Sequence, residues 1–100
     1  MKASDLTGDW YRSTEEEHSG RVVYRGPTYD FPPVRRARPS VRLKPDGTAA
    51  FGVAGPADRT EESPGRWELE GDVLRLVGAG RSEEFVIESL GDEVMVLTPR

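Results

Sequence analysis

Residues 66–77 read RWELEGDVLRLV and carry the clearest structural signal in the chain. Charged side chains alternate with Trp67 and Leu69 in the first half, and leucines recur at every second position in the second half. Such alternation predicts half-buried strands. The two halves meet at Gly71-Asp72, a two-residue loop with glycine first, which is typical of a tight β-hairpin. The stretch therefore predicts two antiparallel strands.

The same two signals, alternation and tight turns, recur on both sides of this hairpin. Glycine and proline supply 11 and 8 of the 100 residues, and they separate the alternating segments. The turn Pro45-Asp46-Gly47 is a strong example, since proline presets φ and glycine accepts a positive φ. We expect eight strands, at residues 8–15, 21–25, 41–44, 48–54, 66–70, 73–77, 83–89 and 94–98.

Eight short strands joined mostly by tight turns predict an all-β fold. A meander of this length usually closes on itself, because closure removes the two unpaired edges. We therefore expect one domain over residues 1–100, a small antiparallel up-and-down β-barrel of about eight strands, with a two-sheet β-sandwich as the alternative. A barrel of eight strands is just wide enough to be filled by side chains or to hold one small ligand.

Two segments interrupt the pattern of strands. Residues 26–40 contain four prolines, which excludes an inner strand, and a loop this long in a small domain is often functional. Residues 55–64 are polar and predict a second loop.

The start of the chain carries a resemblance to a known family. Residues 6–10, LTGDW, resemble the Gly-x-Trp opening of lipocalin-like small β-barrels. The resemblance implies that Trp10 plugs one end of the barrel under a basic side chain from the last strand, for which Arg100 is the candidate. Twelve of the fourteen basic residues are arginine, which fits a bacterial protein from a GC-rich genome, and we expect an uncharacterised bacterial family.

Composition argues against most catalytic and metal sites. The chain has no cysteine and one histidine, His18, which follows Glu15, Glu16 and Glu17. Without further ligands or a nucleophile near His18, we assign no catalytic residue, no metal and no cofactor. An enzyme is the third functional hypothesis, and it requires His18 buried beside two carboxylates.

The charge is unevenly distributed. Residues 21–44 carry seven basic groups and one acid, 7 − 1 = +6, whereas residues 58–93 carry four arginines and eleven acids, 4 − 11 = −7. The two segments either form a binding face or neutralise each other. The net charge of −4 argues against nucleic acid, the lack of a long apolar run argues against a membrane span, and the polar N-terminus predicts a cytoplasmic location.

The loop over residues 26–40 is the leading candidate for function. It combines aromatic residues on a proline-stiffened backbone with clustered arginines, a set of residues favoured in binding sites. The leading hypothesis is a non-enzymatic module that binds a small molecule at the barrel mouth, gated by this loop. The alternative is a protein-interaction or regulatory domain that uses the loop on an acidic partner. A purely structural reading makes the loop a lid over one barrel end, with Phe31 as its plug and its arginines paired to Glu15–Glu17 or to Asp58. The candidate binding residues are Tyr24, Tyr29, Phe31, Arg35, Arg36 and Arg38.

Overall fold

The hairpin predicted around Gly71-Asp72 is present. In the computed structural model, which describes residues 2–32, 38–54, 60–78 and 80–100, Glu70 pairs with Val73 across a two-residue turn. Gly71 has a φ of 63°, a left-handed conformation that favours glycine at this position.

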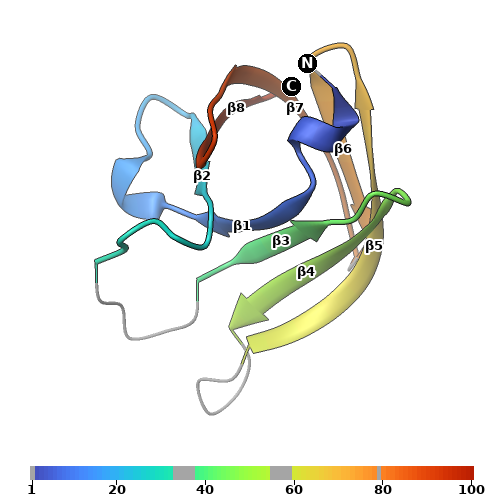
Figure 1. The fold of residues 1–100 in the computed structure, drawn as a ribbon, viewed down its shortest axis with the longest axis horizontal. Helices are drawn as coiled ribbons and strands as arrows, with labels where there is room; N and C mark the ends of the chain where they lie inside the picture. Colours follow the sequence, from blue (N-terminus) through green and yellow to red (C-terminus); the bar gives the residue numbers. More distant parts are fainter. Residues whose placement is uncertain (1, 33–37, 55–59, 79) are drawn as a thin grey trace.

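All eight strands belong to one closed antiparallel barrel (Figure 1). From β3 to β8 each strand pairs with the next, so the predicted all-β class and the eight-stranded up-and-down barrel are confirmed. The strands are β1 (Gly8–Arg12), β2 (Val22–Arg25), β3 (Ser40–Leu43), β4 (Thr48–Ala54), β5 (Thr60–Glu70), β6 (Val73–Gly78), β7 (Arg81–Leu90) and β8 (Val94–Pro99). Two short 3-10 helices accompany them, η1 (Ala3–Asp5) before β1 and η2 (Thr14–Glu16) after it.

One crossover departs from a simple succession of neighbours. Strand β1 lies between β2 and β3, and it is antiparallel to both (Figure 1). Strands β2 and β3 therefore run in the same direction, so the connection between them must return along β1. Connections between strands of like direction need about a dozen residues or more. The topology thus explains the length of the segment between Arg25 and Ser40.

Two predicted boundaries are wrong by three residues or more, while the others differ by two at most. The first strand was expected to reach Glu15, but it ends at Arg12 because residues 14–16 turn into η2. The polar segment 55–64 was expected to be a loop, but β5 already begins at Thr60. Polarity misled the prediction here, because the inner positions beside Phe51 hold small residues rather than apolar ones. A Cβ built at Gly65 would collide with the Phe51 ring.

The barrel interior is filled by one continuous apolar cluster. At the end of the barrel nearest η1, both tryptophans donate their indole N–H groups to backbone carbonyls, Trp10 to Leu6 and Trp67 to Lys44, each at 2.8 Å. We call this end the closed end and the opposite end, where β8 finishes, the mouth. The cluster consists of Leu6, Trp10, Val22, Tyr24, Val41, Leu43, Ala49, Phe51, Trp67, Leu74, Leu76, Phe85, Ile87, Met95 and Leu97.

No helix in the described part of the chain is both long and apolar enough to span a membrane.

Candidate functional site

The described part of the loop between β2 and β3, residues 26–32 and 38–39, forms a strap against the outer face of β1. The backbone N–H of Arg12 donates to the carbonyl of Pro39 at 2.8 Å. Because Trp10 faces the core, Tyr11 must face outward, and its ring meets Phe31 of the strap edge to face with 6.2 Å between ring centroids. The strap therefore covers β1 from outside.

Aromatic rings and guanidinium groups alternate within the strap. Phe31 and Tyr29 contact each other edge to face, with ring centroids 4.8 Å apart. The guanidinium of Arg38 lies 4.3 Å from the Phe31 centroid, and that of Arg25 lies 4.4 Å from the Tyr29 centroid. Cation–π contacts of this geometry stabilise a surface segment modestly. They fix the strap as a folded unit.

Each of the three consecutive glutamates at η2 binds an arginine from a different segment. Glu15 accepts from Arg38 of the strap at 2.7 Å. Both Glu16 oxygens accept from Arg25 of β2, and both Glu17 oxygens from Arg12 of β1. The Arg38 hydrogen bond lowers the pKa of Glu15 to about 2, and the Arg25 hydrogen bond lowers the pKa of Glu16 to about 2. Glu15 and Glu16 are therefore charged at neutral pH. Glu15 ties η2 to the strap, whereas Glu16 and Glu17 tie this region to β2 and β1.

The structure brings together only some of the predicted binding residues. Tyr29, Phe31 and Arg38 do meet, as a structural cluster that also uses Arg25. Tyr24 does not join them, because it points into the barrel while its neighbour Arg25 points outward. The candidates Arg35 and Arg36 lie outside the described residues.

The predicted pairing of the loop's arginines with Glu15–Glu17 is confirmed for Arg38. The alternative partner Asp58 lies outside the described residues. Phe31 does not plug a barrel end, because it packs against Tyr11 on the outer face of β1.

No ion pair between described side chains joins residues 21–44 to residues 58–93, but the charge of Glu62, after that of Asp9, helps to raise the pKa of Arg42. Arg75 instead pairs with three acids of its own segment, Glu68, Glu70 and Glu84.

Tyr24 lines a different site, a pocket of about 390 Å³ at the open end of the barrel, which we call the mouth pocket. The first residues of β7 extend past the end of β8 there, since Phe85 pairs with Pro99 while β7 already begins at Arg81. The lining includes Arg12, Val22, Tyr24, Arg81, Phe85 and Arg100.

The mouth pocket combines polar walls with an aromatic neighbour. The guanidinium of Arg81 lies 5.0 Å from the centroid of Phe51 and contacts Glu83. Burial raises the pKa of the Tyr24 phenol, while Arg81 and Arg12 act against this shift. The phenol stays protonated at neutral pH and provides both a donor and an acceptor.

Every arginine of the mouth pocket has an acidic partner nearby. Arg12 pairs with Glu17, and Arg100 lies 3.7 Å from Glu84. The pocket is therefore close to neutral in charge while presenting many hydrogen-bonding groups. Sequence reasoning missed Arg81, although its alternation with Glu83 and Phe85 was a usable signal for one inward face.

The stacking of Arg100 over Trp10, which the family resemblance implied, is wrong. Arg100 follows β8 at the mouth, whereas the Trp10 indole bonds to Leu6 at the closed end. The two residues therefore lie toward opposite ends of the barrel.

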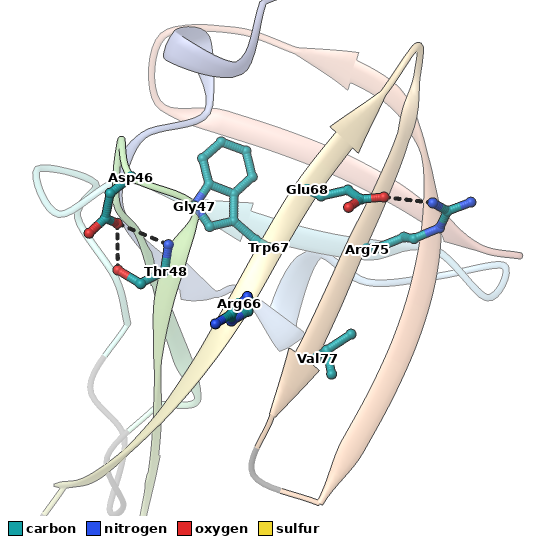
Figure 2. A pocket seen from close by; sticks show the side chains of 8 residues that line it. All are labelled: Asp46, Gly47, Thr48, Arg66, Trp67, Glu68, Arg75 and Val77. Carbon is teal, nitrogen blue, oxygen red and sulfur yellow. Dashed lines mark hydrogen bonds and ion pairs between the residues drawn. The ribbon is translucent and has the colours of Figure 1, made fainter.

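A second concavity lies on the outer face of the barrel, beside the β3–β4 turn. This outer groove has a volume of about 500 Å³ and is lined by Asp46, Gly47, Thr48, Arg66, Trp67, Glu68, Arg75 and Val77 (Figure 2). Nothing in the sequence reasoning singled it out, because its residues come from three strands and one turn.

His18 does not form the buried site that the enzyme hypothesis requires. Its side chain is exposed, and Nδ1 lies 3.1 Å from the backbone carbonyl oxygen of Glu16. Within residues 2–32, 38–54, 60–78 and 80–100, no group of three or more His, Asp or Glu side chains has a metal-binding arrangement.

No protein-family model matches this sequence, and neither a curated protein nor a solved structure is significantly similar to it. The architecture remains informative: a closed barrel of eight antiparallel strands is compatible with a lipocalin-like fold. Fold alone does not assign function, which depends on the chemistry of the two concavities.

Proposed function

We propose that this protein is a binding module that takes a small polar molecule in the mouth pocket. One observation carries the proposal: the Tyr24 side chain and the Arg12 and Arg81 guanidinium groups converge on one pocket of about 390 Å³. Pockets of roughly 300–1,000 Å³ with a few convergent polar groups are typical of small-molecule sites.

The proposed ligand binds at the end of the barrel and not in the barrel interior. Trp10, Tyr24, Phe51 and Trp67, which a central ligand would separate, belong to one cluster and are 1–7% exposed. The near-neutral lining favours an uncharged or zwitterionic molecule, because an anion would compete with glutamates for arginines that are already paired.

We include in this proposal that the protein is related to the lipocalin-like barrels, that it is bacterial and that it is cytoplasmic. The Gly8-to-Trp10 opening and the closed barrel support the first. The gate formed by residues 26–40 has less support, since none of the residues lining the mouth pocket belongs to the strap.

An acidic protein partner for the same loop also has less support. Arg38 is 10% exposed and already holds Glu15, so a partner's carboxylate would have to displace an existing bidentate pair. Such displacement exchanges one ion pair for another with little net gain.

Native mass spectrometry tests the proposal. The protein is incubated with a small-molecule extract of its expression host, desalted and measured beside Arg81→Gln and the matched surface variant Arg21→Gln. We expect a stoichiometric adduct of defined mass on the unmodified protein and on Arg21→Gln, and at least about tenfold lower occupancy on Arg81→Gln. A bare mass throughout, or an adduct that Arg81→Gln retains, contradicts the proposal. Equal urea midpoints exclude unfolding as the cause.

A further inference from the structure

The outer groove holds one arginine whose hydrogen-bonding capacity is unused by the described residues. The other charged groups of the groove are occupied. Asp46 Oδ1 accepts from the backbone N–H of Thr48 at 2.9 Å and from its hydroxyl at 2.6 Å. Glu68 accepts from Arg75 at 2.7 Å.

Arg66 differs from these neighbours. Its side chain is exposed and makes no hydrogen bond or ion pair with any side chain that the structure describes. Figure 2 shows Arg66 between the Asp46–Thr48 turn and Val77, with no interaction drawn to it. A guanidinium offers five N–H donors and binds carboxylates in a bidentate manner.

An apolar surface adjoins this free guanidinium. Val77 pairs with Arg66 across β5 and β6 and is 49% exposed, the one large hydrophobic side chain in the described part of the chain that is exposed to this degree. The buried Trp67 contributes to the same lining. A cation beside an apolar patch in one concavity is complementary to an amphiphilic anion.

From this juxtaposition, we propose that the outer groove is a second binding site, which takes a small monocarboxylate with a short apolar body. The carboxylate binds Arg66, and the apolar body covers Val77. Asp46 and Glu68 contribute carboxylates to the same lining, and their negative charge disfavours a dianion such as phosphate. The site is independent of the mouth pocket, because the two linings share no residue.

A chemical-shift titration of the ¹⁵N-labelled full chain tests the site, with 3-methylbutanoate as the probe. We expect saturable shifts of the Thr48, Arg66 and Val77 amides with a dissociation constant of about 1 mM, and no such shifts with the uncharged 3-methylbutanamide. Inorganic phosphate should bind more weakly than 3-methylbutanoate.

Two variants distinguish a specific binding site from nonspecific attraction of the anion to any exposed arginine. Arg66→Gln should weaken 3-methylbutanoate binding by about tenfold or more, since a charge-assisted bidentate contact is lost. Arg21→Gln removes another exposed arginine outside the groove and should leave the titration unchanged. The proposal is overturned if no saturable shift occurs, if the amide binds equally well, or if Arg66→Gln, with its spectrum otherwise intact, retains wild-type affinity.

Discussion

Two faces of the barrel carry similar numbers of arginine–glutamate pairs but use them differently. On the strap face, three glutamates that follow one another in sequence bind arginines from three separate segments, and the side chains are 10–34% exposed. On the opposite hairpin face, Arg75 reaches three nearby glutamates, and the side chains are 36–72% exposed.

The difference shows why a count of ion pairs says little about stability. Exposed pairs are screened by water and contribute little, whereas half-buried bidentate pairs reinforced by aromatic rings fix the position of a chain segment. The contacts on the strap face also hold the long connection between β2 and β3 against β1. We therefore expect substitutions on the strap face to lower the free energy of unfolding more than similar substitutions on the hairpin face.

The largest effect is expected at Phe31. Phe31→Ala removes the contacts with Tyr11, Tyr29 and Arg38 together and should lower the free energy of unfolding by about 2 kcal/mol, less than for a fully buried phenylalanine. Urea unfolding followed by tryptophan fluorescence measures it. The control Val77→Ala, on the hairpin face, should change the stability by less than about 0.5 kcal/mol. Equal effects of the two substitutions would refute a stabilising strap.

A matched pair of arginine variants sharpens the comparison at smaller magnitude. Arg38→Gln removes the bidentate contact with Glu15, the contact with the Phe31 ring and hydrogen bonds to the carbonyls of Arg12 and Pro32, so we expect a loss of about 1 kcal/mol. Arg75→Gln should have a much smaller effect on the urea midpoint. In about 1 M NaCl the effect of Arg75→Gln should vanish, while part of the Arg38→Gln effect persists. Identical salt dependence of the two variants would contradict this account.

The parts of the fold set by neighbouring residues were predictable from the sequence. The hairpin at residues 66–77 followed from local alternation and from the glycine that its turn requires. Likewise, the clean alternation around Trp67 placed its side chain opposite the charged ones, and Trp67 is buried in the core.

The parts set by remote pairing were not predictable in the same way. The position of β1 between β2 and β3 depends on hydrogen bonds between distant segments, which the sequence does not reveal. The length of the loop over residues 26–40 was therefore interpreted as a sign of function, although it follows from the strand order. Only part of the mouth pocket was predicted from the sequence. Tyr24 was among the predicted binding residues, but Arg81 was not, because it lies in a charged stretch and only the closed barrel determines which of its side chains face inward. The outer groove joins a turn to three strands that only the folded sheet brings together.

The smallest expected effect is a dependence of stability on acid pH that belongs to the strap face. Glu15 and Glu16 have pKa values lowered from the ordinary 4.5 to about 2 by hydrogen bonds from Arg38 and Arg25. Between pH 4.5 and pH 2 the unfolded chain binds more protons than the folded one, so the stabilisation is present above this range and is lost as the pH falls through it. Both side chains are about one third exposed, 34% and 31%, and solvent screening keeps the effect small. Urea midpoints measured across this range should fall less steeply for the double variant Glu15→Gln and Glu16→Gln than for the unmodified protein. Arg38→Gln should flatten the profile partly, since it removes the partner of Glu15 alone, and unchanged slopes in both variants would show that these carboxylates do not couple folding to pH.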